Sequence, residues 1–346
     1  MDIQTETTKE KSIPTASSDL IYGLDERPPF KDALFAALQH LLAIFVGIIT
    51  PPLIICGALK TDLATTGFMV SMALFASGLS TIIQCRKFGP LGCGLLCIQG
   101  TSFSFIGPII TAGMQGGLPL IFGCCMAASP VEMIVSRTFK YMRHIITPLV
   151  SGIVVLLIGL SLVKVGIVSC GGGYAAMDNG TFGMGSIVLG LILGYAVAFA
   201  LGKVDLSKAM TTDIWAFNIP MPFKYGLNFD FSVFIALALI YLITAIEATG
   251  DVTANSMISG EPIEGDLYLK RVSGGVLADG FNSCLAGIFN SFPNSIFAQN
   301  NGIIQLTGVA SRYVGYYIAA MLILLGLFPI VGIAFSLMPD PVLGGA

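Results

Sequence analysis

Two carboxylates interrupt a long apolar stretch of the sequence, "IALALIYLITAIEATGDVTANSM" (235–257). Residues three, four and eight positions apart lie on one face of an α-helix. The polar side chains of this stretch therefore form one stripe, made of Thr244, Glu247, Asp251 and Asn255. A carboxylate at the centre of a bilayer costs about 2.5–3.5 kcal/mol, so we expect the stripe to face protein or water. There it can bind a ligand or carry a proton; a purely structural pair between helices is the alternative.

Further polar side chains cluster in a few segments of the sequence. Gln99, Thr101 and Ser102 lie in "IQGTSFSFIGP", and Asp279 lies in "GGVLADGFNS". A third group, Gln299, Asn300 and Asn301, lies in the Pro- and Asn-rich segment 291–308. One interrupted segment in each half of a membrane protein indicates a binding site near the bilayer midplane. His40 is the one histidine within an apolar run, where a packing role and a ligand role are equally plausible.

The composition indicates what must position these residues. Apolar residues make up 55% of the 346 residues and charged residues 11%, against roughly a quarter charged in soluble domains. Apolar runs of about 20 residues, the length that spans a bilayer, recur along the chain. The eight cysteines show no zinc-binding spacing, and no basic patch suggests nucleic acid. The predicted spans are 33–57, 64–84, 91–113, 118–136, 145–169, 185–202, 231–258, 273–291 and 312–338.

Lysine and arginine predict the orientation of these spans, because they concentrate in cytoplasmic loops. Arg86 and Lys87 follow the second span, and Arg137, Lys140 and Arg143 follow the fourth. Residues 1–32 are polar and carry Lys9, Lys11, Arg27 and Lys31, which is typical of a cytoplasmic tail. The sequence therefore predicts a multi-pass protein of the cell inner membrane with its amino terminus in the cytoplasm.

Several motifs resemble one transporter family. The segment "FAQNNGIIQLTGVASRYVG" is similar to the signature of the nucleobase–ascorbate transporters, also called nucleobase:cation symporter 2. The signature pattern fits Gln299, Asn300, Gly302, Thr307 and Gly308. "AIEATGDVTA", "GGVLADG", "QHLLAIFV", "ITPLVSGIVV" and "PFKYG" also resemble the bacterial xanthine permeases of that family. The resemblance extends from about residue 20 to the end of the chain.

The resemblance implies an all-α polytopic fold of two inverted seven-segment repeats, with short strands and half-helices in the third and tenth segments. The implied division is a core domain (33–140 and 231–340) and a gate domain (141–230), with 341–346 opening another gate segment. Measured against that fold, the resemblance implies that the sixth and the twelfth to fourteenth segments are missing. Six crossings before residue 231 would also start the Glu247 helix inside, whereas inverted repeats need an odd number of crossings per half.

The resemblance also implies roles for individual residues. The implied substrate-binding residues are Glu247, Gln299, Phe103, Ser102, Ala298 and Asn300. The residues implied in coupling or affinity are Asp279, Asp251 and His40. No metal site and no cofactor are expected, with a proton as the coupling ion. Carboxylate and amide groups at positions 247 and 299 could pair with the N–H and C=O groups of an oxopurine.

The predicted function is proton-coupled uptake of a purine base, xanthine or urate, by alternating access between core and gate. We expect a non-enzyme that functions as a homodimer and binds no nucleic acid. One alternative is a shortened fragment that does not transport. A remote alternative is an intramembrane aspartyl protease, since "ATGD" resembles a Gly-x-Gly-Asp motif. In this chain, however, Ala248 replaces the first glycine, and Asp279 follows Ala278 instead of tyrosine.

Overall fold

The computed structural model describes residues 20–142, 153, 156, 217 and 219–328. The elements of this part of the chain are α1 (Phe30–Ala58), α2 (Leu63–Arg86), β1 (Gln99–Thr101), the 3-10 helix η1 (Phe103–Phe105), α3 (Ile106–Met142), α7 (Phe231–Ile258), α8 (Gly265–Ile288), β2 (Asn294–Ile296), α9 (Gln299–Thr307) and α10 (Arg312–Leu327). Four helices are long and apolar enough to cross a membrane: α1, α2, α7 and the segment Phe103–Thr138. The predicted mainly helical polytopic fold is confirmed for these residues.

Two predicted spans differ from the helices that form. The span predicted at 91–113 begins with loop and strand, and becomes helical only from Phe103 onward. Gly117, with φ 68° and ψ −165°, then divides α3 into a short first part and a long second part ending at Met142. The span predicted at 273–291 begins earlier, at Gly265. The predicted spans 145–169 and 185–202, and the end of 312–338, lie outside the described residues.

Local chemistry explains where the long helices begin. Asp62 and Asp230 precede α2 and α7, and their carboxylates accept hydrogen bonds from the backbone N–H groups of Thr65 and Val233 at 3.1 and 3.0 Å. Such caps satisfy N–H groups that have no partner within the helix. The hydrogen bonds from Thr65 also lower the pKa of the Asp62 carboxyl.

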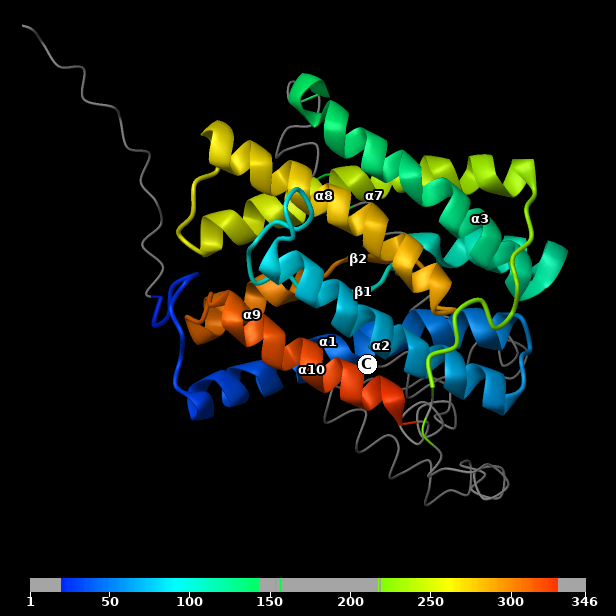
Figure 1. The fold of residues 1–346 in the computed structure, drawn as a ribbon, viewed down its shortest axis with the longest axis horizontal. Helices are drawn as coiled ribbons and strands as arrows, with labels where there is room; N and C mark the ends of the chain where they lie inside the picture. The colour runs from blue at the N-terminus through cyan, green and yellow to red at the C-terminus, as the bar shows by residue number, and fades with distance from the viewer. Residues whose placement is uncertain (1–19, 143–152, 154–155, 157–216, 218, 329–346) are drawn as a thin grey trace, which may run out of the picture.

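The two strands pair at the centre of the molecule (Figure 1). β1 and β2 are antiparallel, with Gly100 opposite Ser295. The pairing continues past the strands, because the Ser102 N–H donates to the Pro293 carbonyl at 2.8 Å. The strands expected in the two interrupted segments are therefore present, and they join the two halves of the sequence.

Two pairs of helices pack through glycine in a corresponding way. A Cβ added to Gly78 of α2 would lie 2.7 Å from the Ala319 carbonyl oxygen of α10. A Cβ added to Gly280 of α8 would lie 3.0 Å from the Ser129 carbonyl oxygen of α3. Small residues permit such close approach between membrane helices. The α2–α10 and α8–α3 contacts thus place one pair of helices on each side of the paired strands.

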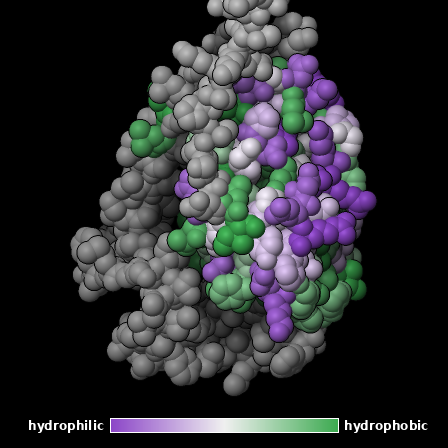
Figure 2. All heavy atoms as spheres, turned by 90° about the vertical axis from the view of Figure 1, so that its left-hand side faces the viewer, coloured by the Kyte–Doolittle hydropathy of each residue, from purple (hydrophilic) through white to green (hydrophobic). Residues whose placement is uncertain are grey.

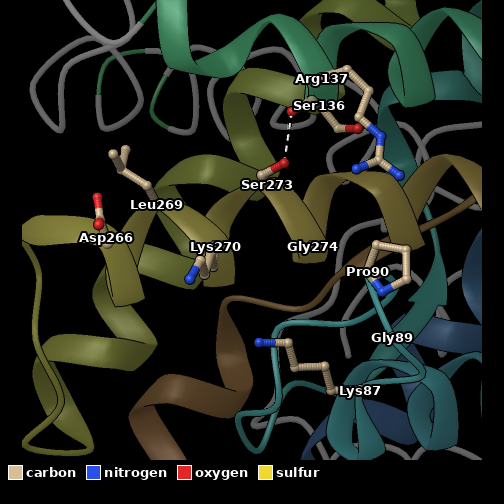
Figure 3. Close-up of a pocket in the computed structure, with 10 residues that line it drawn as sticks. All are labelled: Lys87, Gly89, Pro90, Ser136, Arg137, Asp266, Leu269, Lys270, Ser273 and Gly274. Carbon is tan, nitrogen blue, oxygen red and sulfur yellow. Dashed lines mark hydrogen bonds between the residues drawn. The ribbon is translucent and has the colours of Figure 1, made fainter.

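One end of the molecule is polar and basic. Figure 2 views the left-hand end of Figure 1, where hydrophilic side chains gather. A pocket of about 450 Å³ lies between the end of α2, the end of α3 and the start of α8 (Figure 3). Its charged lining residues are the basic Lys87, Arg137 and Lys270 and the acidic Asp266. Since α8 starts at this end, α7 finishes here, and it starts at the opposite end.

This arrangement answers a question that the sequence left open. Six predicted spans before α7 would start the Glu247 helix at the basic end, whereas inverted repeats need an odd number of crossings and would start it at the opposite end. The Ser273 hydroxyl of α8 instead donates to the Ser136 carbonyl of α3 at 2.8 Å. The Gly92 N–H, after α2, donates to the Gly274 carbonyl at 2.9 Å. These contacts place the end of α7 at the basic end, so α7 has the direction that an odd number of preceding crossings would give.

Candidate functional site

The candidate site lies where two short helices begin beside the paired strands. η1 and the first part of α3 follow β1, and α9 follows β2. The residues that precede these helices, Ser102 and Ala298, make no side-chain cap hydrogen bond. The first N–H groups of a helix have no partner within it and carry partial positive charge. At the start of α9 the Asn300 and Asn301 N–H groups already donate to the carbonyls of Phe297 and Ala298, so the Gln299 N–H is the backbone donor that α9 can offer to a ligand.

Glu247 of α7 reaches the start of the first short helix. The Ser104 hydroxyl donates to Oε2 of Glu247 at 3.2 Å, and both residues are half-buried. Ser104 was absent from the predicted site, which included its neighbours Ser102 and Phe103. Phe103 is half-buried, whereas the Ser102 hydroxyl is buried without a hydrogen-bond partner. The alternation in "TSFSF" was the one signal that Ser104 could share the site.

Gln299 and Ala298 are exposed at the start of α9. The Gln299 side chain forms no hydrogen bond with another described residue, so its amide is available to a ligand. The next residue, Asn300, is buried, and its amide donates to the Leu96 carbonyl. His40 of α1 is fully buried and lies near Asn300. Asn300 and His40 thus lie behind the exposed amide and not at the surface of the site.

The rest of the α7 stripe connects the two short helices to the core. Thr244, Asp251 and Asn255 are buried, as the helical spacing predicted. The Asn255 amide donates to the Leu96 carbonyl at 2.9 Å and to Oδ1 of Asn301 at 2.8 Å. Asn255 therefore holds α7 to α9 and to the segment before β1. Oδ2 of Asp251 has no hydrogen-bond partner.

Asp279 lies in a second layer of buried polar groups. The Gln99 amide of β1 donates to Oδ1 of Asp279. Oε1 of Gln99 in turn accepts from the Asn282 amide of α8 at 3.0 Å. Asn294 of β2 donates to the Ser80 hydroxyl of α2 at 2.9 Å. This network links both strands to α2 and α8.

Sequence analysis missed Glu132, a carboxyl group in the second part of α3. Glu132 is fully buried, and neither of its carboxyl oxygens has a hydrogen-bond partner. Its side chain lies beside Asp279 and Thr244. The available signal was a single acidic residue within the apolar run 118–136. Its proximity to Asp279 arises only from the packing of α3 against α8.

Together these groups suit a small planar molecule with polar edges. The site offers a carboxylate, a free primary amide, a hydroxyl, backbone N–H groups and the half-buried ring of Phe103. No cluster of three or more potential metal ligands occurs among the described residues. The basic pocket of Figure 3 is separate, because none of the predicted site residues lines it.

Comparison with known proteins gives concordant results. A family model described as "Permease family" matches residues 31–184 and 177–346. The chain is 47% identical over 369 aligned positions to the xanthine permease XanP of Escherichia coli strain K12, covering 96% of the chain and 79% of XanP. It is 46% identical over 370 positions to the xanthine permease XanQ of the same strain, with the same coverage of each.

A solved structure shows a similar fold. The transmembrane domain of the cyanobacterial bicarbonate transporter BicA superposes with a TM-score of 0.52 at 14% sequence identity. The match covers 92% of this chain and 88% of the BicA chain. At this identity the likeness concerns the fold alone, which is that of a transporter transmembrane domain.

Proposed function

The chain belongs to the Permease family, and from this premise we propose that it takes up a purine base, with xanthine as the leading candidate. The relatives named XanP and XanQ are xanthine permeases. The observation that carries the proposal is the Ser104–Glu247 hydrogen bond at the start of one short helix, with the Gln299 amide free at the start of the other.

The chemistry of these groups fits an oxopurine. Such a ring presents N–H donors and C=O acceptors along its edges. A carboxylate only accepts hydrogen bonds, whereas an amide both donates and accepts. Glu247 would accept from the ring N–H groups, Gln299 would pair with a second edge, and backbone N–H groups of the short helices would donate to carbonyl oxygens. Phe103 would stack on the ring face.

We further propose coupling to a proton. Asp251 and Asp279 are buried, and neither forms an ion pair with a described residue. Ionisable groups buried within a membrane protein are typical of proton relays, which makes these two carboxyl groups suitable proton carriers. The coupled movement would be alternating access of the core, residues 33–140 and 231–340, against a gate that includes 141–230.

The packing also supports an inverted-repeat architecture of seven plus seven segments. α2 meets α10 and α8 meets α3 through glycines at corresponding positions, and the paired strands relate the two halves. The alignment with XanP is 369 positions long and so exceeds the 346 residues of the chain. XanP therefore carries residues that the chain lacks, which is consistent with a missing sixth segment. The family model also matches in two parts that meet at residues 177–184.

The basic end indicates the orientation in the membrane. Cytoplasmic surfaces are enriched in lysine and arginine, and Lys87, Arg137 and Lys270 lie at one end of the molecule. We place this end in the cytoplasm of a cell whose inner membrane holds the protein, with its amino terminus inside. α7 then runs from the outside to the cytoplasm.

A second candidate function is xanthine binding without transport. The longer alignment with XanP favours it, because a carrier that lacks part of its gate would retain the site but lose the transport cycle. Apolar faces that the missing part covers would then meet lipid or a second copy.

The decisive experiment measures uptake and binding on the same chain. Cells that express it are supplied with labelled xanthine, urate or uracil beside cells that express XanP, and the purified chain is titrated with the same bases. Saturable accumulation of xanthine establishes the carrier. Binding without accumulation establishes the second candidate, and insertion of the missing XanP residues should then restore uptake. Failure to bind any of the three bases would contradict both candidate functions.

A further inference from the structure

Glu132 and Asp279 bring two buried carboxyl groups together behind the candidate site. They come from different helices, α3 and α8, and each is fully buried. A Cβ added to Gly280, next to Asp279, would lie 3.1 Å from the Cβ of Glu132. The absence of a side chain at position 280 thus lets Glu132 approach α8 at the level of Asp279.

The hydrogen bonds of this pair are incomplete in a specific way. Oδ1 of Asp279 accepts from Gln99, but Oδ2 of Asp279 and both carboxyl oxygens of Glu132 have no partner. Two ionised carboxylates offer acceptors only and cannot bond to each other. One proton between them would convert the contact into a hydrogen bond. It would also remove one of two like charges held side by side in a dry interior.

The surroundings supply no cation that could replace this proton. The ionisable groups that face the pair are Glu247, Asp251 and Tyr241 of α7 and the thiol of Cys93, ahead of β1. The neutral groups around it are Thr244 of α7 and Gln99 of β1. On α8 itself, the buried Arg271 pairs with Glu261 at 2.7 Å. Among the described residues, the pair therefore has acidic and neutral neighbours only.

The corresponding contact elsewhere in the molecule shows that packing does not require an acid at position 132. Gly280 faces Ser129 and Met133 of α3, and Gly78 faces Ala319 and Ile323 of α10. The spacing is the same in both contacts, so Glu132 corresponds to Leu322. Leu322 is fully buried in an apolar cluster. An apolar side chain is therefore sufficient for this kind of helix contact, and the carboxyl group at position 132 needs another explanation.

We infer that Glu132 and Asp279 share one proton and form the proton-binding pair of the carrier, with Gln99 as the positioning residue that holds Asp279. The inference rests on the proposed proton-coupled function and identifies where the proton resides. The only bond that changes is the O–H bond of the pair. It breaks when the proton passes to water and re-forms when a proton returns. Glu247 then remains free to bind the purine base.

Infrared spectroscopy of the full chain in lipid tests this directly, because a protonated carboxyl group has a C=O band that shifts in heavy water. The wild type should show such a band at neutral pH. Glu132→Gln and Asp279→Asn should each lose the same component, because the new amide can donate to the remaining carboxylate. The double variant should lose no more than either single variant. Glu264→Gln, the same chemical change at an exposed position, should leave the band intact.

Retention of the full band in a folded Glu132→Gln or Asp279→Asn protein would overturn the inference, as would independent losses that add in the double variant. Either single substitution should remove the shared proton. The test therefore needs only one of the two variants to fold, as judged by thermal melting. The measurement needs no transport. A shared proton in a chain that neither binds nor accumulates purines would refute the proposed function and leave the pair in place. Purine uptake by a chain that shows no shared proton would support the proposed function and refute the proton-sharing pair.

Discussion

At the scale of single residues, Glu247 combines half burial with a hydrogen bond from Ser104 at the start of a short helix. Ser104 orients the carboxylate and leaves its other oxygen able to accept from a ring N–H. The pair therefore defines one edge of the proposed base-binding site.

Glu247→Gln should weaken xanthine binding because it presents an amide N–H₂ to a ring N–H that also donates. A mismatched buried hydrogen bond costs about 1–3 kcal/mol, so the dissociation constant should rise by roughly 5- to 150-fold. Titration of the purified protein measures the change. Glu264→Gln, at an exposed position, is the matched control. Equal affinities for wild type and Glu247→Gln would remove Glu247 from the site.

Gln299→Asn should change which purines compete with xanthine. The asparagine side chain is shorter, so its amide would no longer reach the edge of the base that Gln299 pairs with. A polar group of the base left without a partner discriminates strongly between analogues. Competition by a panel of methylated xanthines measures the order of preference. Gln305→Asn is the matched control, since Gln305 is exposed on the same helix. An order of preference shared by wild type and both variants would show that Gln299 does not contact the base.

At the scale of elements, close helix contacts at glycine hold the candidate site in place. The network of Gln99, Asn282 and Asn294 can form only if α2 and α8 lie near the strands. Gly78 allows α10 to pack closely against α2, and Gly280 allows α3 to pack closely against α8. The strands are three residues long, so they depend on this support.

Gly78→Ala should destabilise the protein, because its Cβ would lie 2.7 Å from the Ala319 carbonyl oxygen and from Ile323. Overpacking of this kind costs about 1–3 kcal/mol, which a thermal melt of the purified protein should register as a lower Tm. Gly57→Ala in α1 is the control, because a Cβ there has no neighbour within 4 Å. Equal melting temperatures for the two variants would show that the α2–α10 contact can relax without loss.

At the scale of the whole molecule, the described helices have a polar basic end and apolar outer faces. Exposed apolar side chains recur along one side of α1 and of α7: Phe30, Leu34, Leu38, Leu42, Phe231, Ile235, Leu239 and Leu242. Such faces suit lipid or another part of a membrane assembly. The homodimer expected from the family resemblance would cover such a face with a second copy.

The proposed orientation predicts which loops are reached from each side of the membrane. Ala64→Cys, exposed at the start of α2, should react with a membrane-impermeant maleimide added outside right-side-out vesicles. Glu264→Cys, exposed at the start of α8, should react only after the vesicles are opened. Described native cysteines are buried or half-buried, and the unmodified chain measures their background. Labelling of Glu264→Cys from the outside would reverse the assigned orientation.

Much of this architecture could be predicted from local sequence. The apolar run at 231–258 coincides with α7, and its helical spacing correctly predicted that Thr244, Asp251 and Asn255 are buried. The breaks around Gln99 and Asn300 correctly predicted two interrupted segments, because Gly, Pro and Asn disfavour continuous helix at those positions. The "FAQNNG" motif and its companions indicated the family that the comparisons then showed.

Only the tertiary structure decided which side chains meet. Ser104, and not Ser102, donates to Glu247, because the 3-10 turn after β1 orients alternate residues differently. Glu132 lies beside Asp279 because Gly280 allows α3 to approach α8 closely. The direction of α7 follows from its packing, whereas the number of apolar runs and the inverted repeat gave opposite directions. Helical periodicity is a property of neighbouring residues, and it determines which face of each helix is buried. Contacts between helices distant in sequence depend on how those faces fit together in space, and no local pattern encodes that fit.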